Sequence, residues 1–383
     1  MRAPLARIAR LQPRIAAWSA VALFGAALAL PMAAQVFGAK AEFGLLELRR
    51  LASAPEIPRN TTAWLRLPAA MDLYLRDHFG LRPHLVNLHL WLGRKLGVSH
   101  THNVLIGKRG WLFFRGDKVI EQYQGTDRFA EAELERWIDA MAANRRWLER
   151  RGVPLLVVIA PDPHGIYAEQ LPDHIERVDA GRLDQLVARL AQRPAFDFVD
   201  LRPALLAAKA REQVYFKTDT HWNTRGAYAA YRAIVDRLRS RFPDMPVLRE
   251  DDLIRTERRA VYGLGRMLAP RGGIAEDDIE LTPRAALTVG PVQTAPPPPR
   301  THGQTPYIAT TVNRAAPRVL VIGDSYFGYM YRFFHGSFAK LTWLRHGFVY
   351  FPAAEIPDDR YDIAIFIMVQ RGLRYRLRGP GQP

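Results

Sequence analysis

The chain has 383 residues, of which 48 % are hydrophobic and 24 % charged, so it is long enough and apolar enough to bury a sizeable core. It contains no cysteine, which excludes disulfides, a thiolate nucleophile and cysteine-based metal sites. The formal net charge is +16, but no basic block is interleaved with aromatic residues, so no nucleic-acid partner is expected.

The amino-terminal residues predict a membrane anchor. Residues 1–14 contain four arginines and no acidic residue, and residues 15–39 carry no charge. About 20 mostly apolar residues suffice to cross a bilayer, and the arginines ahead of this transmembrane signal anchor predict a cytoplasmic tail. A cleaved signal peptide is the alternative, although the uncharged stretch is longer than a usual signal core of about 7–15 residues. Under both interpretations the rest of the chain lies outside the cytoplasm.

Residues 40–105 are expected to form a juxtamembrane helical region. Apolar positions recur at helical spacing over residues 64–97, which predicts amphipathic helices that pack on the following domain or on a membrane partner. Residues 104–114 then predict a hairpin, because Gly107 and Gly110 bracket a basic turn.

Residues 106–375 are expected to form one α/β domain, followed by a tail at 376–383. The predicted helices cover residues 129–151, 181–193 and 224–242, and the predicted strands cover residues 153–160, 196–201, 318–322 and 362–369. This alternation indicates a three-layer α/β domain with a mostly parallel sheet, in which the wholly apolar run 362–369 is a central strand. Residues 285–315, with four consecutive prolines, predict an exposed proline-rich loop.

A short segment after one predicted strand, residues 323–326 (GDSY), places a serine at a functionally favoured position. Ser325 would lie at the carboxyl end of a parallel strand, the edge where ligands bind in open α/β sheets. The next residues, 326–338, lack proline and predict a helix that begins just after the serine.

A second segment, residues 219–223 (DTHWN), precedes that serine by about a hundred positions. A serine hydroxyl is a weak nucleophile unless a base removes its proton, and histidine can do so near neutral pH. We therefore expect His221 to activate Ser325, and Asp219 to orient the imidazole.

Each segment alone has a simpler explanation. Gly, Asp and Ser are common turn residues, and Asp-Thr-His could cap the helix that follows. A metal site would need a third ligand, and none is evident in the sequence. The two segments together favour a nucleophile, a base and an acid, with neither a metal nor another cofactor.

Four segments resemble a known family. Residues 107–114 (GKRGWLFF), 217–223 (KTDTHWN) and 323–326 (GDSY) are similar to the signature blocks of the SGNH-hydrolase-like alginate O-acetyltransferases, and residues 77–82 (DHFGLR) resemble a block that precedes the domain in membrane-anchored members. The resemblance runs from about residue 45 to about residue 375. The Asp and His precede the Ser, as in that family, whereas ordinary SGNH hydrolases carry them after it.

The resemblance implies specific roles for individual residues. Ser325 would be the nucleophile, His221 the general base and Asp219 its orienter, while Tyr331 and Arg371 would line the site.

Further substrate contacts are expected from neighbouring aromatic and basic side chains. Trp222, Tyr326 and Tyr331 could stack on or orient a sugar ring, with core packing as the equal alternative for each. Arg371 could meet the carboxylate of a uronate.

The chain departs from the family pattern at three places. Residues 262–268 (YGLGRML) lack the acidic group of an expected Gly-Asp-Leu block, and residues 162–164 (DPH) stand where relatives often carry a lysine. Gln370 stands where a Glu would hold Arg371. None of these changes touches the three proposed catalytic residues, so they bear on substrate choice and on supporting contacts.

The resemblance implies an O-acetyltransferase that acts on an exported polysaccharide, alginate-like or another exopolysaccharide, through an acetyl-serine intermediate. It further implies an acetyl donor relayed by a membrane-bound O-acyltransferase, and a single-pass protein of the bacterial inner membrane with its catalytic domain in the periplasm. Two alternatives stay open. One is an acetyl esterase with the same chemistry and water as acceptor; the other is a non-catalytic polysaccharide-binding scaffold of a secretion complex.

Overall fold

A computed structural model of the chain describes residues 17–26, 29–30, 33, 52–58, 60–78, 80–269, 272–285, 287, 293–294, 306–346 and 351–380. The chain divides into two compact units, Met1–His100 with Ala269–Gly272, and Thr101–Leu268 with Gly273–Pro383.

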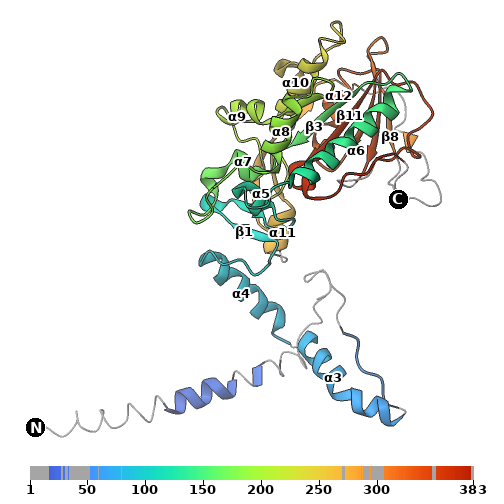
Figure 1. Cartoon of the computed structure of the whole chain (residues 1–383). Coiled ribbons are helices and arrows are strands. Elements are labelled where there is room, and N and C mark those ends of the chain that lie inside the picture. Colours follow the sequence, from blue (N-terminus) through green and yellow to red (C-terminus); the bar gives the residue numbers. More distant parts are fainter. Residues whose placement is uncertain are drawn as a thin grey trace, which may run out of the picture. The chain divides into compact units, whose positions relative to one another are not determined.

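The first unit contains two consecutive helices, α3 (Thr61–His78) and α4 (Arg82–Lys95), in the region where helical spacing predicts them (Figure 1). Among the described residues, no helix combines the length and the apolar character that a membrane crossing requires. The expected span at 15–39 lies partly outside the described residues, as do many positions of the expected proline-rich loop at 285–315. Both features therefore remain predictions.

A seven-stranded sheet forms the centre of the second unit, in the order β4-β3-β11-β9-β10-β8-β7. Its strands are β3 (Leu155–Ala160), β4 (Asp197–Asp200), β7 (Gln293–Thr294), β8 (Tyr307–Thr310), β9 (Arg318–Gly323), β10 (Lys340–Arg345) and β11 (Ile363–Val369). Neighbouring strands are parallel from β4 to β10, whereas β8 is antiparallel to both β10 and β7. The sheet is therefore mixed, and the expected parallel arrangement applies only to the five strands from β4 to β10.

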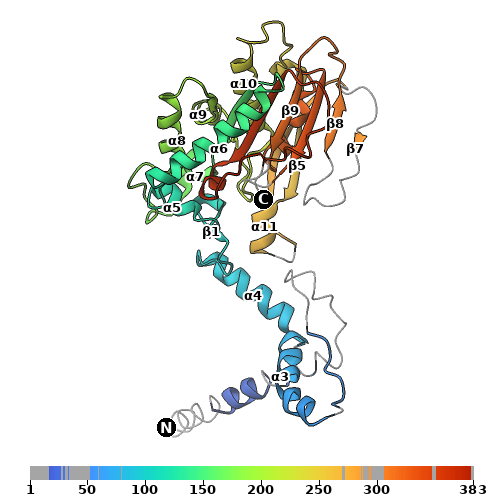
Figure 2. The ribbon, with the colours of Figure 1, turned by 45° about the vertical axis from the view of Figure 1, so that its right-hand side comes forward.

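Helices cover both faces of this sheet, so the predicted three layers are present (Figures 1 and 2). The helices of the second unit are α5 (Val119–Gln124), α6 (Glu131–Glu149), α7 (Pro163–Ile166), α8 (Arg182–Ala191), α9 (Arg202–Lys209), α10 (Thr224–Leu238), α11 (Gly263–Leu268) and α12 (Tyr331–Phe334). Successive side chains of a strand point to opposite faces. On β3, Leu155 and Val157 pack with α6 and α8, while Leu156 and Val158 pack with α9 and α10. The expected central strand is confirmed by β11, which is buried throughout and lies between β3 and β9.

Two hairpins stand beside the main sheet. The predicted one is confirmed as β1 (Val104–Ile106) paired with β2 (Leu112–Phe114). The other, β5 (Leu253–Val261) paired with β6 (Ala275–Pro283), was not predicted. Its strands are rich in charged residues, which hide the alternation of apolar and polar positions typical of a strand.

The helix expected over residues 326–338 is shorter and interrupted. A 3₁₀ turn at Phe327–Tyr329 is followed by the single turn of α12. Two glycines, Gly328 and Gly336, and a run of aromatic residues lower the helix propensity of this segment. Phe327, Phe333 and Phe334 are nevertheless buried, so core packing rather than a regular helix determines its path.

Candidate active site

Ser325 lies just beyond the carboxyl end of β9, as predicted from the apolar run before it. The last residue of β9, Gly323, is beside Ile367 of the neighbouring β11. A Cβ atom on Gly323 would lie 2.6 Å from the Ile367 side chain, so the close approach of the two strands requires a glycine. The sheet thereby sets the position from which the serine side chain leaves the strand.

The turn that carries the serine is held by Asp324, whose side chain is buried. Its Oδ1 accepts the N–H of Tyr326 at 2.9 Å, and its Oδ2 accepts the N–H of Val369 in β11 at 2.7 Å. Burial raises the pKa of Asp324, and the two N–H donors lower it only in part. Asp324 therefore joins the serine turn to the adjacent strand.

The structure brings Ser325, His221 and Asp219 together into one hydrogen-bonded series. Ser325 Oγ lies 2.8 Å from His221 Nε2, and His221 Nδ1 lies 2.6 Å from Asp219 Oδ1. An ionised carboxylate only accepts hydrogen bonds, so Nδ1 carries a proton and Nε2 is free to accept the serine hydroxyl. Two segments separated by about a hundred positions thus form the predicted arrangement.

Asp219 is held as an anion by a set of donors. Its Oδ1 accepts the N–H groups of Thr220 at 2.6 Å and His221 at 3.1 Å, and its Oδ2 accepts the N–H of Gly263 at 2.6 Å. Burial raises the pKa of Asp219, but the hydrogen bond and charge of His221, together with the Gly263 and His221 N–H groups, outweigh it and hold the pKa below its usual value. The block at 262–268, which lacks the expected acidic group, therefore contributes a backbone donor.

The hairpin β5–β6 supports the loop that leads to Asp219. Glu276 of β6 is buried, and its carboxylate accepts the N–H of Lys217 at 3.0 Å and of Thr218 at 2.6 Å. Sequence patterns gave no indication of this support, because the hairpin itself was not predicted.

Helix α10 begins directly after the same loop, and its cap is Asn223. The Asn223 side chain accepts the N–H groups of Arg225 and Gly226, each at 3.1 Å. Capping is therefore the role of Asn223, which leaves Asp219 and His221 available to interact with the serine.

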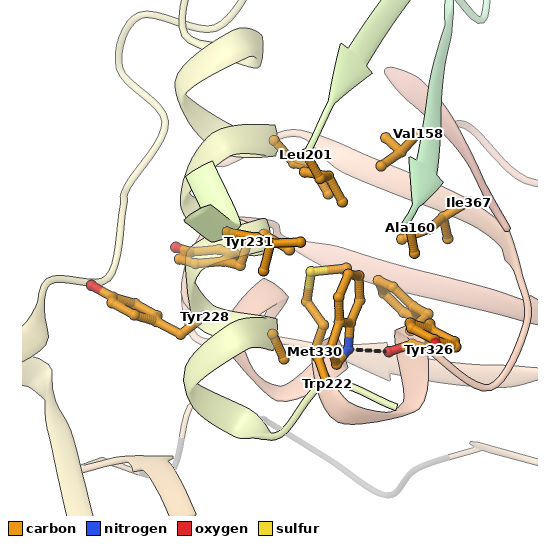
Figure 3. Packing of buried hydrophobic residues seen from close by; sticks show 14 of the residues in the cluster. Val158, Ala160, Leu201, Trp222, Tyr228, Tyr231, Tyr326, Met330 and Ile367 are labelled. Carbon is orange, nitrogen blue, oxygen red and sulfur yellow. Dashed lines mark hydrogen bonds between the residues drawn. The ribbon is translucent and has the colours of Figure 1, made fainter. Parts of the chain in front are cut away.

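The structure corrects the expectation that Trp222 and Tyr326 contact a sugar. Both side chains are completely buried, and Figure 3 shows them close to Met330. Trp222 Nε1 donates to the Tyr326 carbonyl oxygen at 3.0 Å, and the Tyr326 hydroxyl donates to the carbonyl of Thr220. They therefore position the His221 loop against the serine turn from within the core.

Arg371 also differs from expectation, because it is 6 % exposed and pairs with a carboxylate of the protein. Its Nη1 lies 2.5 Å from Asp162 Oδ1, and its backbone N–H donates to Asp162 Oδ2 at 2.9 Å. Gln370 Oε1 accepts the N–H of Asp162 at 3.3 Å. Asp162 thus takes the role expected of an acid at position 370, and the Arg371 guanidinium is committed to this pair rather than to a uronate.

Tyr331 packs among other aromatic residues. Its ring is stacked on Trp343, with centres 6.1 Å apart, and meets Tyr307 edge-on at 5.1 Å. Its hydroxyl accepts a hydrogen bond from Arg332 Nε at 3.1 Å. Tyr331 is half-buried, so part of it remains open to solvent.

Sequence reasoning missed the aromatic side chains that lie against His221. The ring centre of Tyr329 is 5.3 Å from that of His221 and 5.5 Å from that of Phe216, which stacks on Tyr262 at 3.9 Å. Burial and the charge of Asp219 raise the pKa of Tyr329 to about 12, so its hydroxyl keeps its proton at neutral pH. In the sequence, the position of Tyr329 four residues after Ser325 was the available indication that it lies near the site.

Across the part of the chain that the structure describes, no cluster of three or more His, Asp or Glu side chains is arranged to hold a metal ion. The hydrogen-bonded series of Asp219, His221 and Ser325 offers the chemistry of an activated serine hydroxyl, with His221 as proton acceptor.

A family model and several known proteins match this chain. Residues 104–338 match the family model described as the SGNH hydrolase-like domain of the acetyltransferase AlgX. The probable alginate O-acetylases AlgJ of Pseudomonas aeruginosa and Pseudomonas syringae are 29 % identical over 167 residues and 28 % identical over 162 residues. Each match covers 42 % of this chain, and the chain spans 40 % of the length of each of these relatives.

Solved structures show the same fold at lower identity. Bacillus cereus PatB1 aligns over 70 % of this chain and 96 % of its own, with a TM-score of 0.50 and 16 % identity. A DHHW family protein from Eubacterium siraeum aligns over 72 % of this chain and 99 % of its own, with a TM-score of 0.50 and 17 % identity. With the family match covering more than half of its residues, the chain belongs to the SGNH hydrolase-like family of the acetyltransferase AlgX.

Proposed function

We propose that this protein is an O-acetyltransferase that acetylates hydroxyl groups of an exported polysaccharide through an acetyl-serine intermediate. The observation that carries the proposal is the hydrogen-bonded series Asp219–His221–Ser325 at the carboxyl edge of the sheet. The similarity to probable alginate O-acetylases supports an alginate-like polymer as acceptor.

In the first half-reaction, Ser325 is acetylated. His221 Nε2 removes the proton from Ser325 Oγ as the oxygen attacks the acetyl carbonyl of the donor. The tetrahedral intermediate collapses, the bond to the donor breaks, and the leaving group takes the proton from His221. The charge of Asp219 stabilises the imidazolium that forms between these steps.

In the second half-reaction, the acetyl group moves to the polysaccharide. A sugar hydroxyl gives its proton to His221 and attacks the acetyl-serine carbonyl, and Ser325 Oγ leaves and recovers the proton. Each tetrahedral intermediate carries a negative oxygen that needs a preorganised donor, and the Ser325 N–H is the candidate. The Gly263 N–H is already engaged with Asp219 and is not available for this role.

We further propose that the domain works in the periplasm, anchored in the bacterial inner membrane by residues 15–39, and receives acetyl groups from a membrane-bound O-acyltransferase. The uncharged run behind four arginines supports the anchor. Anchoring beside the donor would raise its effective concentration at Ser325. Alkaline carbonate extraction tests the anchor, because an integral span stays with the bilayer.

The catalytic proposal is tested by the fate of the acetyl group. The purified full chain and its Ser325→Ala variant are incubated with an activated acetyl ester and candidate polysaccharides, and acetyl on sugar and acetate in water are both measured. We expect serine-dependent acetylation of the sugar. Serine-dependent release to water alone, with every acceptor tried, would instead identify an esterase. Absence of both turnover and acetyl-serine would support the scaffold alternative.

A further inference from the structure

Two tyrosines lie against the imidazole of His221, and they differ in their exposure to solvent. The ring centre of Tyr326 is 4.8 Å from that of His221, and Tyr326 is completely buried. The ring centre of Tyr329 is 5.3 Å from that of His221, and Tyr329 is partly exposed. Of these two rings, that of Tyr329 therefore borders both the imidazole and the solvent.

Tyr329 is held in place by the turn that carries the nucleophile. The Ser325 carbonyl accepts the N–H of Gly328 at 3.1 Å, and the Tyr326 carbonyl accepts the N–H of Tyr329 at 3.3 Å. These bonds belong to a 3₁₀ turn, which is tighter than a turn of α-helix. The position of the Tyr329 ring is thus set by the same few residues that position the serine hydroxyl.

Two further rings support Tyr329. Phe216 is buried, its ring centre lies 5.5 Å from that of Tyr329, and its N–H donates to the His221 carbonyl at 3.2 Å. Phe216 in turn stacks on Tyr262 at 3.9 Å, directly before Gly263, whose N–H binds the catalytic aspartate. We call Tyr329, Phe216 and Tyr262 the aromatic wall. This wall is fixed to the backbone of His221 and ends beside a donor of the catalytic series.

Water competes with a sugar at this histidine. The His221 side chain is 19 % exposed, so solvent reaches it. In an acetyl-serine intermediate, a water molecule can give a proton to His221 Nε2 while its oxygen bonds to the acetyl carbon; Ser325 Oγ then leaves and takes that proton, and acetic acid is released. Hydrolysis uses the same base and the same acyl group as transfer to a sugar. The presence of ordered water at His221 therefore decides between the two products.

The aromatic wall is poorly suited to hold such a water molecule. An ordered water needs about 2–4 polar partners, and aromatic ring faces are only weak acceptors. Exclusion of water from a site protects a reactive intermediate from hydrolysis. A sugar hydroxyl, by contrast, is brought to the base by the binding of the whole saccharide and not by contacts of the hydroxyl alone.

We propose that Tyr329, supported by Phe216 and Tyr262, keeps water from His221 and so directs the acetyl group of the acetylated serine to a sugar hydroxyl rather than to water. Tyr329 is then a specificity-determining residue, and it neither donates nor accepts a proton in the reaction. The inference rests on the proposed acetyl-serine intermediate, but it is independent of which polysaccharide accepts the acetyl group.

The lifetime of acetyl-serine without any acceptor tests this role. The full chain and its Tyr329→Ala and Tyr329→Phe variants are acetylated with an activated acetyl ester and freed of the ester, and the loss of the acetyl group in buffer is followed by intact-protein mass spectrometry. We expect Tyr329→Ala to lose the group about tenfold faster than the parent protein. Tyr329→Phe keeps the ring and should match the parent. Each rate constant describes only molecules that became acetylated, so a smaller folded fraction does not change it.

A role of Tyr329 in sugar binding predicts a different pattern. In that case Tyr329→Ala would keep the parent lifetime in buffer, and only transfer to an added polysaccharide would fall. That pattern, or a longer lifetime in Tyr329→Ala, would overturn the inference. If the parent passes acetyl to a sugar while all three lifetimes agree, acetyl transfer stands and only the role of the wall is wrong. If the parent forms no acetyl-serine, the proposed function fails together with this inference.

Discussion

Asp219 and Asp324 are both buried aspartates beside the serine, yet their pKa values move in opposite directions. Burial raises the pKa of each, but Asp219 also has the hydrogen bond and charge of His221, which together with backbone donors bring its pKa below the usual value. Burial of Asp324 outweighs its two backbone donors and the charges of Arg371 and His221, so its pKa stays raised. Asp219 is therefore the carboxylate suited to stabilise a charged imidazole.

The low pKa of Asp219 predicts a pH-dependent contribution to stability. A depressed folded-state pKa gives stabilisation that is complete above the ordinary value of 3.8 and is lost as the pH falls through the lower folded value. Asp219→Asn should therefore cost about 1–3 kcal/mol of unfolding free energy at neutral pH and less in strong acid. Its transfer rate should fall about 10³–10⁴-fold. The loss of unfolding free energy is measured by urea unfolding of both proteins at a series of pH values from 7 to 2. A difference in unfolding free energy that stays constant down to pH 2 contradicts the prediction.

The sequence indicated Ser325, His221 and Asp219 because each stands in a short segment next to a recognisable strand or helix. It could not indicate that Asp162 pairs with Arg371, because these residues are 209 positions apart and meet only when β3 and β11 become neighbours. Nor could it separate Tyr329, which faces His221, from Tyr326, which faces the core, since a broken helix has no regular period.

At the scale of elements, the β5–β6 hairpin shows the limit of pattern reading most clearly. Its many charged residues are typical of a solvated surface, yet Glu276 and Asp278 of β6 are buried. Glu276 binds the loop before Asp219, and Asp278 binds Arg225 in the first turn of α10. The buried face of β6 is charged because its neighbours are backbone N–H groups and the Arg225 side chain rather than apolar side chains.

This role of the hairpin predicts a specific defect in the Glu276→Gln variant. One amide oxygen cannot replace two carboxylate oxygens that accept the N–H groups of Lys217 and Thr218, so a buried donor loses its partner at a cost of about 1–3 kcal/mol. We expect lower stability and a lower kcat for acetyl transfer. The control is Asp277→Asn, on the exposed face of the same strand, which should change stability by less than about 0.5 kcal/mol. Equal effects of the two variants in urea unfolding and in kcat would contradict a specific support role for Glu276.

At the scale of the whole molecule, alternating strands and helices predicted the three layers and the position of β11. They did not predict the antiparallel edge, because β7 and β8 lie within residues 285–315, where this alternation breaks, and are only two and four residues long. Both large core clusters and the Asp219–His221–Ser325 series lie within the second unit.

This concentration of the core predicts that residues 101–383 fold without residues 1–100. We expect cooperative thermal unfolding of this fragment, and its recovery in the soluble fraction of cells, whereas the full chain should stay with membranes after alkaline carbonate extraction. A non-cooperative transition in the fragment would show that residues 1–100 contribute to the core. Extraction of the full chain by carbonate would count against the anchor.

The strand ends around the serine are joined beyond the point where the sheet stops. Asp324 links the turn after β9 to Val369 of β11, and Asp162, after β3, binds the backbone and side chain of Arg371 just past β11. Three adjacent strand ends are thus connected by carboxylates. Under the proposed mechanism, this arrangement lowers the reorganisation that catalysis would otherwise require, because Ser325 and His221 are aligned before an acetyl donor binds.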